Sequence, residues 1–207
     1  DQGAEQEIGM QFVNERNEIG YLWKDGRWWW SSGLVVSPNE WSHVALTVDT
    51  NGATVYVNGV GRTDVVKLTP QNLASLIMKL GTYHSWASRN FNGYIDEVCF
   101  YDRKLSEEEI RRGMHCTKKI GDAGLIAYYQ FNESHPQQIF DKVAGRDGIY
   151  ESGASVAPSQ ALVGQAESEI EDMRPGIRRI VFDELGDEID LRSTVDGGKV
   201  LLTRMLV

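Results

Sequence analysis

The sequence is poor in cysteine and in positive charge, and it has no long apolar run. Its two cysteines, Cys99 and Cys116, are too few for a disulfide framework. They form a single disulfide in an oxidising compartment, or else one is a buried strand thiol and the other a loop thiol. The 21 Lys and Arg against 30 Asp and Glu give a net charge of −9. Because phosphate binding needs clustered cations, this balance argues against a nucleic-acid partner. No apolar run approaches the roughly 18 residues of a membrane-spanning helix, so we expect no membrane insertion.

The 207 residues are enough for one large or two small domains with a buried core. The first residues include neither an initiator Met nor a signal peptide, and the last seven, Leu-Leu-Thr-Arg-Met-Leu-Val, read like the middle of a strand. We therefore expect a piece of a longer protein, whose neighbouring domains would be its first partners.

Short apolar runs separated by turn signals dominate the first hundred residues. Lys24-Asp25-Gly26 lies between apolar flanks, which is typical of a β-hairpin. Trp41–Asp49 alternates with period two, and tight turns then lead into Thr54–Val57. Lys79–Thr82 resembles a further strand, and Tyr94–Tyr101 a longer one. This spacing predicts an antiparallel all-β sandwich or barrel.

A short helix is predicted after the last of these strands. Ser106 with Glu109 three residues later forms a capping box, and Leu105 and Ile110 are spaced as a hydrophobic staple. We expect the helix to run to about Met114, to cover the edge of the sandwich and to carry no chemistry.

A different pattern begins at Gly124. It contains an apolar strand-like run over 125–131, then Ser/Ala/Gly/Pro-rich residues over 152–166, which read as a linker. Strand-like patterning resumes from Ile177. The predicted organisation is a sandwich over residues 1–121, a connector and linker over 122–166, and the start of a further β domain over 167–207.

The motifs from Trp41 to Ile110 resemble the laminin-G-like, concanavalin-A-like jelly-roll superfamily. The resemblance rests on Trp41 with His43-Val44-Ala45, on Tyr56-Val57-Asn58-Gly59, on Leu80-Gly81, on Phe91-Asn92-Gly93 before Ile95-Asp96-Glu97-Val98, and on Leu105-Ser106 with Glu109-Ile110. It implies an antiparallel jelly-roll sandwich. Family members begin with two or three strands before the equivalent of Ile8, so the sandwich is cut at the front or completed by another segment.

The segment Gly124–Gly148 resembles a connector found in large surface proteins of Bacteroidota bacteria, where it often follows such a jelly roll. This resemblance implies an exported protein that is extracellular or on the cell surface, with the type IX secretion machinery as a possible partner. It also implies that further domains follow the linker.

Catalytic motifs are weak in this sequence. Glu188-Ile189-Asp190-Leu191 echoes a strand of jelly-roll glycoside hydrolases, but Arg192 and Ser193 stand where a third carboxylate is needed. There is no Gly-x-Ser-x-Gly elbow, and the four histidines are scattered. We therefore expect no enzymatic activity.

Calcium is the one cofactor that the resemblance implies. Related jelly rolls often hold a structural Ca²⁺ through the Asp of the Ile-Asp-Glu-Val strand, which is Asp96 here, together with backbone carbonyls. The alternative is that Asp96 caps a turn or pairs with Arg103 or Arg89.

Aromatic side chains are the candidate ligand contacts, because they stack on the C–H faces of sugars. Trp28 and Trp30 share one face of a regular strand and Trp29 takes the other, so at least one of them belongs to the core. Tyr83 and Trp86 lie in a loop. The predicted ligand site is therefore Trp28, Trp30, Tyr83 and Trp86.

These observations favour a non-catalytic binding or adhesion module in a secreted or cell-surface protein, with a glycan or other cell-surface polymer as ligand. Two alternatives remain open. One is a structural spacer or carrier domain with no small ligand, and the other is an accessory domain of a secreted hydrolase.

Overall fold

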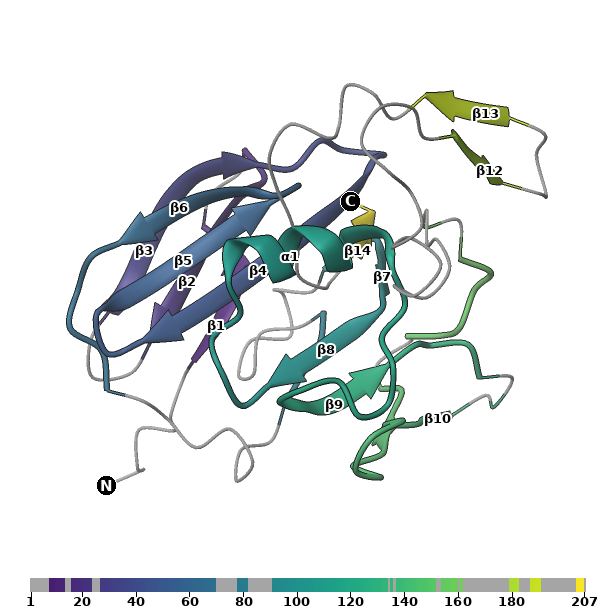
Figure 1. Cartoon of the computed structure of the whole chain (residues 1–207). Coiled ribbons are helices and arrows are strands. Elements are labelled where there is room, and N and C mark those ends of the chain that lie inside the picture. The colour runs from purple at the N-terminus through teal and green to yellow at the C-terminus, as the bar shows by residue number, and fades with distance from the viewer. Residues whose placement is uncertain are drawn as a thin grey trace.

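The computed structural model describes residues 8–13, 16–23, 27–69, 78–81, 91–133, 135, 137–151, 154–159 and 161. It also describes the backbone of residues 179–182, 187–190 and 204–206 (Figure 1). The regular secondary structure of the described residues is mostly antiparallel β-strand with one short α-helix, which confirms the predicted fold class of an all-β sandwich.

The first sheet is a three-stranded antiparallel meander in the order β1-β2-β3. Its strands are β1 (Ile8–Phe12), β2 (Glu18–Trp23) and β3 (Arg27–Val35). β2 and β3 flank the predicted Asp25-Gly26 turn and pair antiparallel, as a hairpin requires.

The second sheet has five strands in the order β6-β5-β4-β14-β7. β4 (Trp41–Asp49), β5 (Gly52–Val57) and β6 (Val60–Asp64) form the predicted meander. β7 (Tyr94–Asp96) lies at the far edge, and β14 (Arg204–Leu206) lies between β4 and β7.

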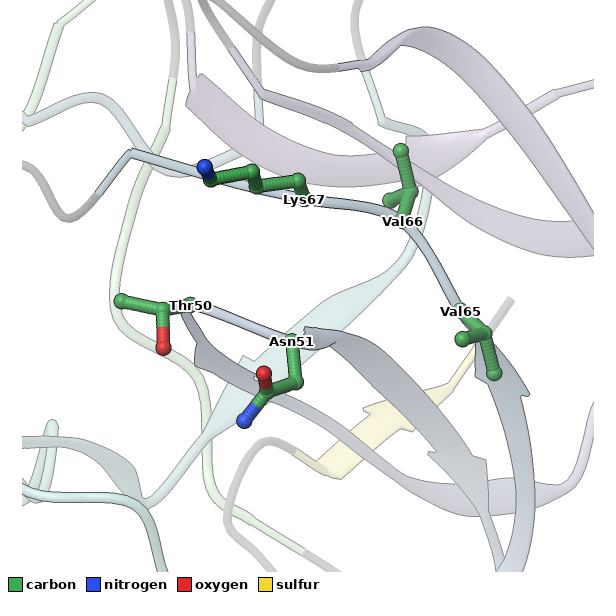
Figure 2. Close-up of a pocket in the computed structure, with 5 residues that line it drawn as sticks. All are labelled: Thr50, Asn51, Val65, Val66 and Lys67. Atoms are coloured by element: carbon green, nitrogen blue, oxygen red, sulfur yellow. The ribbon is translucent and has the colours of Figure 1, made fainter.

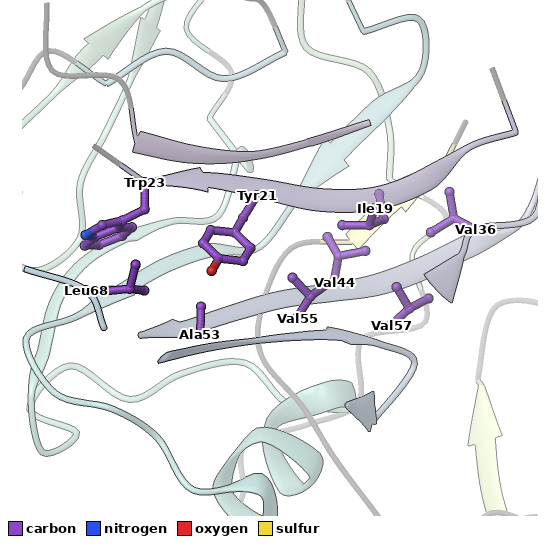
Figure 3. Close-up of a cluster of buried hydrophobic side chains, with 9 residues drawn as sticks. All are labelled: Ile19, Tyr21, Trp23, Val36, Val44, Ala53, Val55, Val57 and Leu68. Atoms are coloured by element: carbon purple, nitrogen blue, oxygen red, sulfur yellow. The ribbon is translucent and has the colours of Figure 1, made fainter. Parts of the chain in front are cut away.

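The main hydrophobic core fills the space between these two sheets. Alternate residues of each strand point inward, and each fully buried Val, Leu or Ile stabilises the fold by roughly 1.5–3 kcal/mol. Figure 3 shows nine buried side chains of this core, namely Ile19, Tyr21, Trp23, Val36, Val44, Ala53, Val55, Val57 and Leu68.

The helix α1 (Glu107–Arg112) packs on the second sheet, on the face that points away from the first sheet (Figure 1). Ile110 is fully buried against Ala45 of β4 and Tyr56 of β5. The capping box of Ser106 and Glu109 is present as predicted, and a 3₁₀ turn η2 (Gly113–His115) follows. The helix therefore covers a face of the sheet, not the edge of the sandwich.

The strand predicted over Tyr94–Tyr101 is divided in two at Glu97. This residue has a left-handed φ of 54°, and its buried carboxylate accepts a hydrogen bond from the Tyr128 hydroxyl. β7 ends before Glu97, and β8 (Val98–Tyr101) continues after it in a different pairing. The prediction of one continuous strand is wrong, because a left-handed residue cannot continue an extended ladder.

β8 pairs with β9 (Leu125–Tyr129), so the residues after Gly124 pack directly on the sandwich. β10 (Gln138–Ile139) and β11 (Gly148–Ile149) form a short hairpin around a turn built on Asp141. Asp141 Oδ1 accepts from the N–H groups of Tyr128 and Val143, and Oδ2 from those of Ala144 and Arg146, at 2.9–3.3 Å. Although burial alone would raise it, these four donors hold the pKa of Asp141 below its usual value.

The last described strands are β12 (Arg179–Phe182) and β13 (Asp187–Asp190), which pair antiparallel, and β14. The predicted strand at Ile180–Phe182 is therefore present, whereas Val200–Leu202 lies outside the described residues. β9 and β14 pair with strands of the first 121 residues. The division at 121/122 and 166/167 stays a prediction.

Three smaller expectations concern strand 79–82, the thiols and the membrane. Residues 79–81 are not in a strand, and Thr82 lies outside the described part. Cys99 and Cys116 are both buried, and neither is in a disulfide. In the described part of the chain, no helix has both the length and the apolar character that a bilayer crossing requires.

Candidate functional site

The tryptophan run on β3 does not follow simple alternation. Tyr21 of β2 pairs with Trp30 and Trp23 pairs with Arg27, and the register shifts between these two pairs. One residue of β2 therefore faces the two residues Trp28-Trp29 of β3, which is the arrangement of a β-bulge. Because a bulge inserts one residue, Arg27 and Trp30 both face the second sheet.

The bulge leaves two neighbouring tryptophans at the surface. Trp28 is 67% exposed and Trp29 is 42% exposed. Trp30 instead packs on the core, with its ring centroid 5.7 Å from that of Tyr21. The prediction that Trp28 and Trp30 share a face is not what the register shows, since Trp29 and not Trp30 is the exposed neighbour of Trp28.

A polar triad, in which Tyr21 and Asp64 are buried and Arg27 is partly exposed, lies beside these tryptophans. The Arg27 guanidinium binds both carboxylate oxygens of Asp64, at 2.6 and 2.7 Å, and the Tyr21 hydroxyl donates to Asp64 Oδ2 at 2.8 Å. Burial, together with the neighbouring Asp64 carboxylate, raises the pKa of Tyr21. The hydrogen bond to Asp64 raises the pKa of Arg27. The triad joins β2 and β3 to the end of β6, and so holds the start of β3 in place.

One glycine permits this arrangement. Gly52 begins β5 opposite the end of β6 and has a φ of 149°, and a Cβ atom there would lie 2.2 Å from the Asp64 carbonyl oxygen. Any other residue at position 52 would push β6 away and shift Asp64 from Arg27.

A surface pocket of about 370 Å³ opens at the same end of the sandwich. Figure 2 shows Thr50 and Asn51, from the turn between β4 and β5, on one side, and Val65, Val66 and Lys67, which follow β6, on the other. The pocket offers a hydroxyl, an amide and an ammonium group beside two apolar side chains. These are groups that can orient a polar ligand against an apolar surface.

A second pocket of about 350 Å³ lies beside the connector, between Phe131–Glu133 and Val156–Ser159. Its buried acid, Glu133, forms a 2.6 Å ion pair with Lys142. This pairing gives Glu133 a structural role.

Asp96 is buried at the end of β7. One carboxylate oxygen accepts from the Glu97 N–H at 3.0 Å, and the other accepts from the Ser159 hydroxyl. Ca²⁺ prefers six to eight oxygen ligands. Within the described residues, no three or more His, Cys, Asp or Glu side chains are grouped so that they could hold a metal ion. A site built from Asp96 and backbone carbonyls needs no such group of side chains, so calcium at Asp96 stays a prediction, as does the alternative that Asp96 caps a turn or pairs with an arginine.

Tyr83 and Trp86 lie outside the described residues, as does His84. His43 is buried in β4, whereas His135 is exposed and precedes β10. Cys99 is buried, and burial raises the pKa of its thiol well above the usual range, which disfavours a reactive thiolate.

Sequence reasoning missed Trp29, Arg27 and Asp64. Trp29 was assigned to the opposite face because a bulge leaves no signal in a run of three identical residues. The Arg27–Asp64 pair joins residues 37 positions apart, and nothing in the local pattern marks either partner.

Comparison with known proteins agrees with this fold. Residues 1–111 match the family model of laminin G type that is described as the concanavalin A-like lectin/glucanases superfamily. Searches of the curated proteins and of the solved structures gave no match.

Proposed function

The chain belongs to the concanavalin A-like lectin/glucanases superfamily, and we propose that it is a non-catalytic module that binds carbohydrate outside the cell. Laminin G-like domains are typically binding modules, and this is the coarse function that membership supports. The same modules are often extracellular. The glycan ligand, the secreted or cell-surface location and the passage through a type IX route are parts of the proposal.

One observation carries the proposal, namely the exposed pair Trp28 and Trp29. Monomeric proteins rarely leave two neighbouring tryptophans at the surface, and an indole face is well suited to stack on the C–H groups of a pyranose ring. Trp28 and Trp29 directly follow Arg27 on β3. The Asp64 carboxylate fixes Arg27 through two hydrogen bonds. A rigid platform loses little conformational entropy when a ligand binds.

The polar part of the proposed site is the pocket at the β6 end of the sandwich. Arg27 is paired with Asp64. Val65 follows Asp64 in the sequence and lines the pocket, so the ion pair and the pocket are adjacent along the chain. Asn51 and Lys67 are the pocket groups that would bind sugar hydroxyls while the tryptophans stack on the ring. Trp30 supports the platform from the core side, and Tyr83 and Trp86 stay predicted contacts.

A glycan array with the full chain tests the proposal. We expect selective binding, and we expect Trp28→Ala and Trp29→Ala each to weaken it about tenfold, the equivalent of one stacking contact. Trp30→Ala should lower stability because Trp30 packs on the core. The matched control is Ile120→Ala, which removes another exposed apolar side chain.

Two results would contradict the proposal. Binding that is unchanged in both tryptophan variants would exclude this platform as the site. A folded chain that retains no glycan would favour the structural spacer, in which the exposed tryptophans cover a neighbouring domain. Running the array in calcium and in chelator tests the calcium prediction at Asp96 separately.

A further inference from the structure

The position of β14 inside the second sheet is unusual for its place in the sequence. β14 lies between β4 and β7, so residues 204–206 are bordered on both sides by strands that precede residue 97. Neighbouring strands lie about 4.8 Å apart, so without β14 the backbones of β4 and β7 would be about 10 Å apart. That distance is too long for a backbone hydrogen bond. The two strands therefore border a slot, which we define as the space between Trp41–His43 and Tyr94–Asp96.

The strand register places aromatic residues at one end of the slot and ionisable residues at the other. Trp41 and Tyr94 both lie opposite position 206, and their ring centroids are 6.5 Å apart. Residues directly opposite each other share a face of a sheet, so position 206 lies beside two aromatic rings.

At the other end of the slot, His43 and Asp96 both lie opposite position 204. Both residues are buried, each with 4% exposure. An acidic residue at low exposure favours a basic residue on the neighbouring strand. The slot thus suits an extended segment with a basic residue two positions before a large apolar one, and the chain has Arg204 and Leu206 at these positions.

We propose that this slot is a strand-exchange site, and that β14 of a second copy of the chain takes the place of the chain's own β14. An exchanged strand would make the same backbone ladder in either copy, so the exchange costs little free energy. β14 has only three residues, so few ladder bonds must break before it leaves. Strand addition of this kind takes its affinity from the backbone and its specificity from alternate side chains. The partner is therefore a second copy of this protein.

A peptide-binding experiment tests the slot. A fluorescent peptide with the sequence of residues 201–207 is titrated into the full wild-type chain and into Met205→Pro, in which the proline removes a ladder N–H from β14. We expect Met205→Pro to bind about tenfold tighter, because its own strand no longer competes at high effective concentration. A peptide carrying proline in place of Met205 should not bind. A peptide with glutamate in place of Arg204 should bind about tenfold weaker, since it would lie opposite Asp96.

A second variant keeps the test valid if Met205→Pro does not fold. Arg204→Glu in the full chain reverses the charge opposite Asp96 without removing a backbone donor, and it should also bind the wild-type peptide more tightly than the wild-type chain does. Equal binding by wild type and both variants would overturn the slot. No binding to folded Met205→Pro would overturn it as well.

Light scattering after size exclusion tests the exchange itself. We expect the dimeric fraction of the wild-type chain to increase with protein concentration. Excess peptide should convert the dimer back to monomer. Met205→Pro should stay monomeric. A wild-type chain that stays monomeric up to about millimolar concentration, the usual effective concentration of a tethered strand, would overturn the exchange between copies.

Discussion

Replacing Asp64 by Ala should destabilise the protein by about 3 kcal/mol, and the structure gives the reason. Asp64 is the only acceptor shown for the Tyr21 hydroxyl among the described residues, and it binds Arg27 through both oxygens. Asp64→Ala leaves the buried Tyr21 hydroxyl without this partner, which costs about 1–3 kcal/mol. The Arg27 side chain is 35% exposed, so water can replace its partner, and the loss there is about 1 kcal/mol.

The double-mutant cycle with Tyr21→Phe is the sharper part of this prediction. In the wild-type background Tyr21→Phe removes one hydrogen bond to a charged group and should cost about 1.5 kcal/mol. In the Asp64→Ala background the hydroxyl has already lost its acceptor, so its removal should be neutral or stabilising. The expected coupling is therefore about 1.5 kcal/mol.

Urea unfolding followed by tryptophan fluorescence measures these changes, with the m-value as a check that the unfolded state is unaltered. Glu108→Ala is the matched control. Glu108 forms a 3.0 Å ion pair with Arg112, and both side chains are exposed, so its removal should cost under about 0.5 kcal/mol. The reasoning is refuted if Asp64→Ala costs no more than this control, or if Tyr21→Phe has the same effect in both backgrounds.

Three further predictions follow from single residues. Glu109 has a pKa of about 2, lowered from 4.5 by Arg103 and by the Ser106 N–H, so its stabilising effect is complete above pH 4.5 and is lost as the pH falls towards 2. The difference in urea midpoint between wild type and Glu109→Gln should shrink over this range, and a constant difference would contradict it. Asp141→Asn removes the acceptor for the two N–H groups bonded to Oδ2, and it should cost about 2 kcal/mol in the same assay; a loss below about 0.5 kcal/mol would disprove that role. A calcium ion bound at Asp96 would stabilise the folded state, so replacing chelator by about 10 mM Ca²⁺ should raise the melting temperature by several degrees, and an unchanged melting temperature would contradict the calcium prediction.

Local signals explain why much of the sandwich could be predicted from the sequence. The alternation in Trp41–Asp49, the Asn58-Gly59 turn and the Ser106–Glu109 capping box are each encoded within a few residues, and the structure contains all of them. The residues that cause each of these features lie within a few positions of one another, so the local sequence is enough to predict the feature.

The errors share one origin, because each depends on a contact between distant segments. Glu97 turns out of the extended region where its carboxylate meets Tyr128, which is 31 positions away. The bulge that exposes Trp29 belongs to the pairing of β3 with β2, and the triad needs Asp64 on another sheet. Pattern reasoning along one strand cannot include such partners.

The pairing of β8 with β9 has a consequence for dissecting the protein. The family match ends at residue 111, and an expression fragment cut there would lack β9, which hydrogen-bonds along β8. It would also lack the Tyr128 hydroxyl that bonds the buried Glu97 carboxylate. Such a fragment would present a bare strand edge, a common cause of insoluble protein, so the segment after the matched region belongs in any attempt to produce this domain alone.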